Sequence, residues 1–315
     1  NADLTNATLN GTYLIGANLT GATTTGSTIA SAITTTTLTK SNSSAFYLTP
    51  PVGATTTYGP TWSQLGSTIF GSNTDDVLNV QSISKDGTII AVSSPGNDST
   101  GTNRGFVKIF KWSGSSWNQL GGTFYGISNN DLINNSKLSS DGNYVAFRYN
   151  DSAVSNKGFI GIFIYDSNKT VEDTNVNRAS YGPIGWSRVG GFIYNEFVGD
   201  NNNVNIYLSG VCLSGNGQII AIGCEVNDGT SGSLTDNRGS VRVYRYDPNK
   251  LTEISDQSNA NFGPVGWTRM GTDIDGESAG DNFGAMIELS TDGTVLAGAA
   301  INSDVNGTDN GQVRV

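Results

Sequence analysis

Three groups of closely spaced carboxylates are the residues of this sequence that could act as a general acid and base. They are Glu172 with Asp173, Glu253 with Asp256, and Asp273 with Asp275 and Glu277. Hydrolysis of a glycosidic bond needs two carboxyl groups at a fixed separation. All three groups fall in segments whose polar composition predicts loops, where no strand would fix that separation. We therefore interpret them as solvated loop residues rather than as catalytic pairs.

Histidine is absent from the chain. Its absence removes the commonest general base, the base that activates Ser and Cys nucleophiles, and the commonest metal ligand. Carboxylate or tyrosine chemistry stays open, but the composition weighs against an enzyme. We identify no catalytic residue and predict a protein that is not an enzyme.

Carboxylates that could bind calcium are also sparse. A calcium loop surrounds the ion with several oxygen ligands from one short segment. The loops of this chain offer one or two carboxylates each, at Asp75, Asp76, Asp98, Asp281, Asp304 and Asp309. We interpret these side chains as turn residues. We predict no cofactor and no metal site; calcium stays open as an alternative that no ligand loop supports.

Cys212 and Cys224 flank the turn 214–217 of an expected hairpin. Whether that turn has two or four residues, neither cysteine lies opposite the other. Their Cα atoms should therefore be farther apart than the roughly 7 Å that a disulfide allows. We expect two small, buried thiols.

Asn-x-Ser/Thr triplets are the modification signal of this sequence. If the chain is secreted, they could carry glycans, although a chain rich in Asn and Thr also produces such triplets by chance. Four lie at Asn6, Asn10, Asn18 and Asn42. The candidate sites in the rest of the chain are Asn97, Asn134, Asn150, Asn168 and Asn306.

The charge of the chain excludes two classes of partner. The formal net charge is −10, and Lys and Arg form no cluster or stripe. A phosphate backbone or an anionic membrane surface would therefore be repelled. No apolar stretch of about 18 residues is present, so we expect no membrane insertion. The chain begins at Asn1 inside a repeat, so we interpret its N-terminus as cut, and the missing signal peptide is uninformative.

A five-residue repeat occupies residues 1–34. Leu4, Leu9, Leu14 and Leu19 share one register, and Ile29 returns to it. A period of five fits neither a helix face nor a flat strand, and fixed self-similarity marks a solenoid. The alternative is a disordered, Thr-rich tail. Residues 35–60 are polar and contain Pro50, Pro51 and Pro60, so we predict a linker there.

The five-residue register resembles that of the pentapeptide-repeat family, whose pattern is A-(D/N)-L-x-x. The resemblance implies a right-handed β-helix with the central Leu or Ile stacked inside. One coil cannot bury its inner face alone. We therefore expect further coils before Asn1, or stacking of this end on another copy or another protein subunit.

A second repeat fills residues 61–315 and contains four units. Each unit has a Trp-x-x-apolar-Gly motif, an apolar run ending in Ser-x-(Asp/Asn)-Gly, an apolar strand, and an alternating strand that follows a glycine. The tryptophans are Trp62, Trp117, Trp186 and Trp267, and the turn glycines are Gly87, Gly142, Gly217 and Gly293. The later units are longer, with the extra residues in loops such as 226–237 and 247–264.

These signals predict an antiparallel sheet of four strands in each unit. Asp-Gly or Asn-Gly between apolar runs indicates a hairpin, because glycine supplies a positive φ. The run after the turn is apolar on both faces, as a strand buried on both sides would be. Sheets of this size that repeat around an axis are propeller blades. We therefore predict an all-β fold, a partial antiparallel β-propeller preceded by a β-helix segment.

The units resemble the FG-GAP repeats of integrin-like propellers, as a set of motifs over residues 61–315. The fourth unit, with Asp281, Asn282, Phe283 and Gly284, is nearest to that pattern. The resemblance implies adhesion or ligand display. A ring of four blades could close through residues 61–66, but the chain stops at Val315 inside an expected strand, so we expect a larger, truncated ring.

Aromatic residues precede the Trp strands at Tyr58, Tyr181 and Phe262. They could form a rim that binds sugar or protein, but we expect them to pack against the neighbouring blade.

The combination of the two repeats leads to a functional expectation. Asn/Thr-rich proteins that join them resemble those of large DNA viruses of algae and protists. We expect a non-enzymatic structural or adhesive protein, extracellular or on a virion surface, that contacts other protein subunits through the β-helix end and a propeller face. The alternative is a secreted carbohydrate-binding propeller or a glycan-active enzyme.

Overall fold

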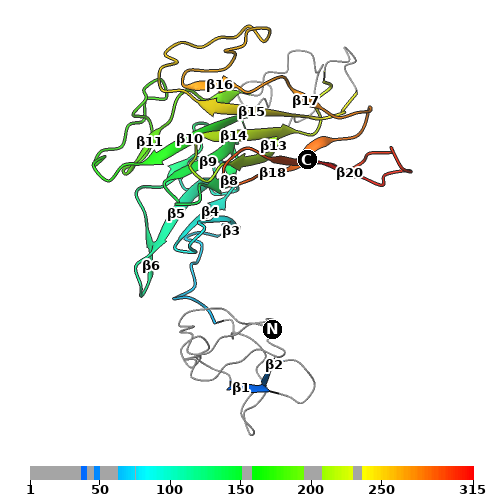
Figure 1. The fold of residues 1–315 in the computed structure, drawn as a ribbon. Coiled ribbons are helices and arrows are strands. Elements are labelled where there is room, and N and C mark those ends of the chain that lie inside the picture. The colour runs from blue at the N-terminus through cyan, green and yellow to red at the C-terminus, as the bar shows by residue number, and fades with distance from the viewer. Residues whose placement is uncertain are drawn as a thin grey trace. The chain divides into compact units, whose positions relative to one another are not determined.

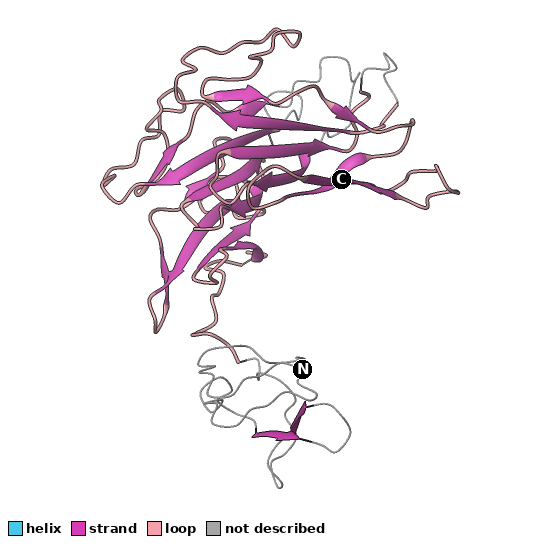
Figure 2. Ribbon diagram, in the orientation of Figure 1, coloured by secondary structure: helices cyan, strands magenta, loops and turns pink. Residues whose placement is uncertain are grey.

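The computed structural model describes residues 37–40, 46–49, 63–74, 76–150, 158–194, 208–229 and 236–315. Within these ranges every regular element is a β-strand (Figure 2), which confirms the all-β prediction. The chain divides into two compact units, residues 1–65 and residues 66–315. The described part contains no helix of membrane-spanning length and hydrophobicity.

A short hairpin lies in the first unit. Strands β1 (Thr37–Lys40) and β2 (Phe46–Thr49) pair antiparallel, with Leu38 opposite Leu48. The sequence predicted a linker here. Thr, Leu, Phe and Tyr favour strands, and they flank the polar residues 41–45, so the local propensity favours the hairpin. The predicted five-residue repeats, Tyr58 and Trp62 lie outside the described residues.

The second unit contains three antiparallel sheets with the same strand order and a shorter fourth sheet (Figure 1). In each of the first three, two short strands pair with the third strand and together form the outer edge. Sheet 1 consists of β3 (Asn79–Ile83), β4 (Ile89–Ser94), β5 (Phe106–Trp112), β6 (Trp117–Gln119) and β7 (Phe124–Tyr125). Sheet 2 consists of β8 (Asn134–Leu138), β9 (Tyr144–Tyr149), β10 (Phe159–Tyr165), β11 (Trp186–Arg188) and β12 (Ile193–Tyr194).

The remaining two sheets repeat this arrangement. Sheet 3 consists of β13 (Leu208–Leu213), β14 (Ile219–Cys224), β15 (Ser240–Tyr246), β16 (Trp267–Arg269) and β17 (Ile274–Asp275). Sheet 4 consists of β18 (Phe283–Leu289), β19 (Leu296–Ala300) and β20 (Gln312–Arg314). The four described sheets are separate and do not form a closed ring, so they do not confirm the predicted propeller.

The Ser-x-(Asp/Asn)-Gly turns join the first and second strands of every sheet. In sheet 1, Ser84 Oγ donates to Asp86 Oδ1 at 2.7 Å, and the Ile89 amide donates to Ser84 Oγ at 2.9 Å. Gly87 has a φ of 74°, which only glycine adopts without strain. The predicted turn glycines share this conformation, with φ values of 71° at Gly142, 69° at Gly217 and 74° at Gly293.

The turn carboxylates make the fold sensitive to acid. Ser84 Oγ and then the Thr88 amide hold the pKa of Asp86 near 2, below its ordinary 3.8. Ser290 Oγ lowers the pKa of Asp292 in the same way. Because the folded pKa values are lower than the unfolded ones, this stabilisation is complete above about pH 4 and is lost as the pH falls toward about 2.

We expect the double variant Asp86→Asn, Asp292→Asn to lose less stability between pH 5 and pH 2 than the wild-type chain, as measured by urea midpoints. Sheet 3 supports this choice, because Asn216 Oδ1 accepts the same bonds from Ser214 Oγ at 2.8 Å and the Gln218 amide at 3.0 Å without a charge. An equal acid-induced loss in both proteins would contradict the assignment.

Consecutive turns are also bonded to one another through the backbone. The Lys85 amide donates to the Ser140 carbonyl at 2.8 Å, the Ser140 amide to the Gly215 carbonyl at 2.9 Å, and the Gly215 amide to the Thr291 carbonyl at 2.6 Å. These four residues occupy the same position in successive turns. The inner edges of the four sheets therefore form one hydrogen-bonded series.

Apolar side chains fill the spaces between successive sheets. Ile89, Ala91, Val107 and Ile109 of sheet 1 pack against sheet 2. Sheets 2 and 3 enclose a second cluster, and sheets 3 and 4 a third. Side chains on both faces of the second strand are buried in sheets 2 and 3, as the continuous apolar runs predicted.

The tryptophans of the second and third sheets each donate a hydrogen bond to the segment that follows the preceding sheet's Trp strand. Trp186 Nε1 donates to the Leu120 carbonyl, and Trp267 Nε1 to the Val189 carbonyl, both at 2.9 Å. Both indoles are fully buried. A Cβ added at Gly121 would lie 2.6 Å from Trp186 Nε1, so this glycine makes room for the next sheet's indole.

Each described tryptophan also contacts an aromatic residue on the neighbouring strand. The ring centroids are 5.4 Å apart for Trp112 and Trp117, 5.3 Å for Tyr165 and Trp186, and 5.3 Å for Tyr246 and Trp267. Trp117, Trp186 and Trp267 therefore occupy equivalent places. In the structure each of these tryptophans belongs to the sheet whose Ser-x-(Asp/Asn)-Gly turn precedes it in the chain.

Candidate functional site

Two long loops leave the outer part of sheets 2 and 3. Residues 166–185 join β10 to β11, and residues 247–266 join β15 to β16. Each loop begins with an Asp whose Oδ1 accepts a hydrogen bond from the backbone amide two residues later. The Asn168 amide donates to Asp166, and the Asn249 amide donates to Asp247, both at 2.9 Å. The two loops therefore start with the same local fold.

A lysine holds each loop closed. Lys250 Nζ donates to the carbonyls of Asn261, Gly263 and Trp267 at 2.6, 2.7 and 2.7 Å. Lys169 Nζ makes the same three bonds in sheet 2, to Ser180, Gly182 and Trp186. Burial lowers the pKa of Lys169. Both ammonium groups are bonded to the backbone, so neither is available as a catalytic base.

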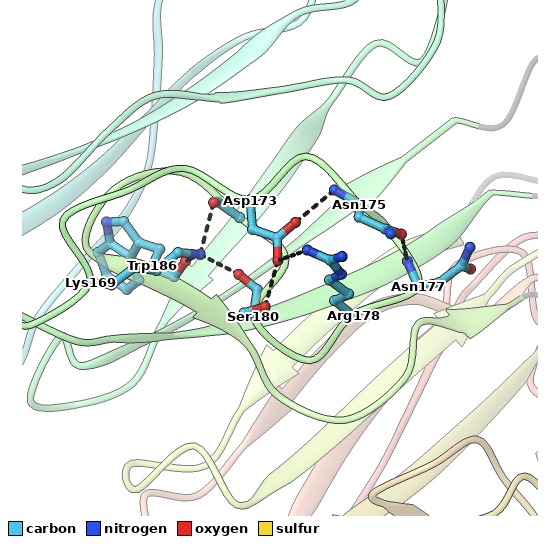
Figure 3. Close-up of polar contacts among 8 residues, drawn as sticks. Lys169, Asp173, Asn175, Asn177, Arg178, Ser180 and Trp186 are labelled. Atoms are coloured by element: carbon cyan, nitrogen blue, oxygen red, sulfur yellow. Dashed lines mark hydrogen bonds and ion pairs between the residues drawn. The ribbon is translucent and has the colours of Figure 1, made fainter.

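Among the positions at which the two loops differ, three have side chains that lie close together in the first loop. Asp173, Arg178 and Ser180 of sheet 2 are replaced by Ile254, Asn259 and Asn261 in the same order. Asp173 Oδ2 accepts Ser180 Oγ at 2.5 Å and lies 3.8 Å from Arg178 Nη1 (Figure 3). Because the second loop keeps its backbone bridge, Ile254 to Gly263, without these side chains, the loop fold does not require them.

These side chains line an open hollow of about 670 Å³. Its wall also includes Lys169, Glu172, Asn175 and Ser187. The Ser180 hydroxyl and then the Asn175 amide hold the pKa of Asp173 below its usual value. Asp173 is therefore a hydrogen-bond acceptor with a negative charge, and not a proton donor, at neutral pH. This arrangement favours binding of a polar group over acid–base catalysis.

The other predicted carboxylate groups are held in structural contacts. Asp273 bridges two arginines, with Oδ2 at 2.6 Å from Arg242 Nη2 and Oδ1 at 3.0 Å from Arg269 Nη1. Asp256 Oδ1 accepts the amide and the hydroxyl of Ser258. Asp256 lies in a loop, as expected, whereas Asp275 of the third group belongs to strand β17 and pairs with Ser240. In the described residues no three His, Cys, Asp or Glu side chains gather as metal ligands would.

The carboxylates considered for calcium instead close loops. Asp98 Oδ1 accepts the Asn103 amide, and Asp304 Oδ1 accepts the Asp309 amide at 2.7 Å. Asp281 Oδ2 accepts the Ser278 amide at 2.9 Å. The interpretation as solvated turn residues holds for Asp98 and Asp304, which are exposed, but not for Asp281, which is buried. Asp75 lies outside the described residues.

Asn97 corrects one of the glycosylation predictions. The side chain is buried, and Nδ2 donates to Asp76 Oδ1 at 2.6 Å. A glycan on this nitrogen would have to displace a buried bond, so the folded chain does not present Asn97 as an acceptor. Asn168 and Asn306 are exposed, whereas Asn134 and Asn150 are partly buried. Modification of these four stays a prediction.

The Asn97 position points to a missing contact in sheet 4. Ser303 occupies the position in sheet 4 that Asn97 occupies in sheet 1. The Ser303 carbonyl accepts the Gly311 amide at 3.1 Å, and the Asn97 carbonyl accepts the equivalent Gly105 amide at 3.0 Å. Ser303 Oγ and Asp281 Oδ1 are both buried there without a hydrogen-bond partner. An unsatisfied buried acceptor costs about 1–3 kcal/mol.

We expect Ser303→Asn to raise the free energy of unfolding by about 1 kcal/mol, because its amide would reach Asp281 as Asn97 reaches Asp76. Urea unfolding would measure the gain. The control Ser303→Ala removes the hydroxyl without supplying a donor and should change little. A destabilised Asn variant would mean that the loop cannot hold the larger side chain.

The aromatic rim considered as an alternative before the Trp strands is not seen at the two described positions, Tyr181 and Phe262. Phe262 is fully buried. Tyr181 packs 5.8 Å from Phe192 and 6.0 Å from Phe163 between ring centroids. Phe262 belongs to the cluster between sheets 2 and 3, and Tyr181 packs on the cluster between sheets 1 and 2, as the expected packing against the neighbouring sheet requires.

A comparison with known protein families finds a match for part of the first unit. Residues 1–28 match the family described as Pentapeptide repeats (8 copies). The pentapeptide repeats contain the register of Leu4, Leu9, Leu14 and Leu19, so the resemblance found in the sequence is confirmed for this segment. They cover a small share of the chain, and no curated protein matches it.

The hollow beside Asp173 was not identified from the sequence. The sequence singled out Glu172 and Asp173 but not Arg178 or Ser180. Alignment of residues 166–186 with residues 247–267 would have shown which residues the loop fold keeps and which differ.

Proposed function

We propose that residues 66–315 form part of an FG-GAP-type β-propeller that serves as a non-enzymatic structural or adhesive protein. The repeated strand order and the hydrogen-bonded series of inner turns support this architecture. A propeller places these turns near its axis and the long loops at its outer edge. The fold then displays loops without demanding a particular sequence from them.

One observation carries the functional proposal. The polar residues that recur from unit to unit are used to build the fold, in turns, loop closures and lysine clamps. Residues that differ between units lie on the loops, as Asp173 and Arg178 do. That division is typical of a scaffold that presents variable surface, and it leaves no repeated catalytic constellation.

We further propose that the protein resides on the surface of a particle, such as a virion of a large DNA virus, or outside a cell. The pentapeptide repeats at residues 1–28 would dock on other protein subunits. Antibody labelling of intact source material, imaged by electron microscopy, tests this location. The expected result is labelling on the particle or filament surface, and labelling confined to a soluble fraction would overturn it.

The hollow at Asp173 supports a second candidate, a carbohydrate-binding protein. Its carboxylate, guanidinium and hydroxyl groups suit a ligand rich in hydroxyl groups. A glycan array separates the two candidates when Asp173→Asn is compared with Asp256→Asn, which removes an exposed carboxylate from the second loop. Binding lost only in Asp173→Asn would favour the lectin. Turnover of a glycan, lost in Glu172→Gln, would overturn both non-enzymatic proposals.

A further inference from the structure

Four asparagines of this chain are followed by glycine, at Asn10, Asn216, Asn306 and Asn310. In such a pair the backbone nitrogen of the glycine can attack the side-chain amide of the asparagine, because glycine has no Cβ to hinder the approach. Asn10 lies outside the described residues. The other three pairs share this sequence, so their surroundings decide which of them can react.

Asn216 is held away from this reaction. Its Oδ1 accepts hydrogen bonds from Ser214 Oγ at 2.8 Å and from the Gln218 amide at 3.0 Å. Gly217 is buried, and its amide donates to the Ser214 carbonyl at 2.9 Å. The amide carbon of Asn216 could therefore reach the glycine nitrogen only if this hairpin turn opened.

Asn306 is far less restrained. It lies in the loop between β19 and β20, and both Asn306 and Gly307 are exposed. In the part of the chain that the structure describes, no hydrogen bond holds the Asn306 side chain. The Gly307 amide donates to the Asp304 carbonyl at 3.1 Å, in an exposed turn. Exposed bonds of this kind open at little cost in free energy.

The same loop position is exposed where another sheet follows. Thr100 holds in sheet 1 the position that Asn306 holds in sheet 4, because each precedes the glycine of an equivalent four-residue turn. Thr100 is exposed, although its loop is bonded to the segment that leads into sheet 2, from Asn103 Nδ2 to Asn130 Oδ1 at 3.2 Å. Exposure at this position is therefore a property of the loop itself.

One contact activates the peptide bond between Asn306 and Gly307. Asn310 Nδ2 donates to the Asn306 carbonyl oxygen at 2.9 Å. When the Gly307 nitrogen loses its proton, negative charge is shared with that oxygen, and a fixed donor beside it stabilises the charge as an oxyanion hole does. The same bond engages the Asn310 side chain, so Asn310 is itself held, as Asn216 is.

We propose that Asn306 is a site of spontaneous deamidation, assisted by the Asn310 amide. The Gly307 nitrogen gives its proton to solvent and attacks Asn306 Cγ. The new C–N bond closes a five-membered succinimide, the Cγ–Nδ2 bond breaks, and Nδ2 takes up a proton and leaves as ammonia. Water then adds to one ring carbonyl carbon and the ring nitrogen regains a proton. Opening at Cγ gives aspartate, and opening at the backbone carbon gives isoaspartate.

The same nitrogen is the predicted glycan acceptor of the triplet that begins at Asn306. Deamidation removes that acceptor and adds a negative charge to the loop. The two modifications therefore exclude each other at this position. The inference is independent of the proposed adhesive function, because the reaction uses only the chain and water.

The test follows the intact, purified chain in mildly alkaline buffer at physiological temperature, with water enriched in heavy oxygen. Peptide mass spectrometry measures conversion at each asparagine, and the heavy oxygen marks products that formed before digestion. Asn306 is expected to convert at least about tenfold faster than Asn216, because the buried turn opens more rarely than the exposed loop. The product at position 306 should contain both isoaspartate and aspartate.

Two variants test the role of the Asn310 amide. Asn310→Ala is expected to slow conversion at Asn306 severalfold, because the ionised peptide loses its donor. If the Asn310 side chain only ordered the loop, its removal would speed the conversion instead. Asn302→Ala is the matched control, since Asn302 Nδ2 donates to Asn282 Oδ1 at 2.8 Å, and its conversion rate should match the wild type. Both changes lie in an exposed loop, so urea unfolding should be unaltered.

Three results would contradict this assignment. Equal rates at Asn306 and Asn216 would overturn the proposal. Conversion to aspartate without isoaspartate would also overturn it, because that product indicates direct hydrolysis of the side-chain amide. A rate in Asn310→Ala equal to or above that of the wild type would overturn the assisting role of Asn310. None of these results bears on what the protein binds or where it resides.

Discussion

Trp267→Ala is expected to lower the free energy of unfolding by about 3–5 kcal/mol, the range for removing a large buried aromatic side chain. The indole is fully buried between sheets 2 and 3, and its Nε1 bonds to the Val189 carbonyl at 2.9 Å. The substitution opens a cavity and leaves that carbonyl without its donor. Urea unfolding followed by tryptophan-independent far-ultraviolet circular dichroism would measure the loss.

Two further variants separate the causes. Trp267→Phe keeps much of the ring but not the N–H group, and should cost about 1–2 kcal/mol for the lost bond plus a smaller packing term. Trp117→Ala changes the equivalent residue of sheet 1, which is only partly buried. A loss at Trp117 equal to the loss at Trp267 would contradict the inter-sheet role.

Lys250→Met is expected to cost about 3 kcal/mol. Each bond from a charged donor contributes about 1.5–3 kcal/mol, and Lys250 makes three with backbone carbonyls in a buried setting. Relief of the desolvated ammonium offsets part of that sum. Methionine keeps the length of the side chain, so packing of the stem changes little. The measurement is the urea midpoint together with hydrogen exchange of the amides in residues 247–266.

The matched control for this variant is Lys169→Met in the first loop. Its ammonium makes the same three contacts but is less buried, so its loss should be smaller. If Lys169→Met destabilised the chain as much as Lys250→Met, burial would not set the strength of the clamp. Protection of the loop amides unchanged in both variants would contradict the clamp itself.

The repeated parts of the fold were predictable because each motif determines the local backbone conformation of a few residues. A positive φ at Gly87 or Gly293 demands glycine, and Asp-Gly between apolar runs leaves few alternatives to a hairpin. Continuous apolar runs correctly indicated strands buried on both faces. The tryptophans were predicted as anchors, although their bonds to the preceding sheet depend on packing that no single unit contains.

The candidate site was harder to predict because it depends on an irregular loop. Asp173, Arg178 and Ser180 meet only after the chain folds back on itself around Lys169, and no periodic pattern encodes that return. Asn97 was misjudged for a similar reason: the triplet that signals glycosylation also places an amide beside Asp76, and only the fold shows which applies.

The two cysteines have a consequence for the conditions under which this chain keeps its fold. Cys212 lies opposite Ala221 and Cys224 opposite Leu208, so the strand register separates them, and both thiols are buried. Burial raises the pKa of Cys212 to about 12, which keeps it protonated and unreactive at physiological pH. Among the described residues no covalent cross-link holds the sheets together. We expect the second unit to be equally stable in reducing and in oxidising surroundings, because its fold draws on no redox-sensitive bond.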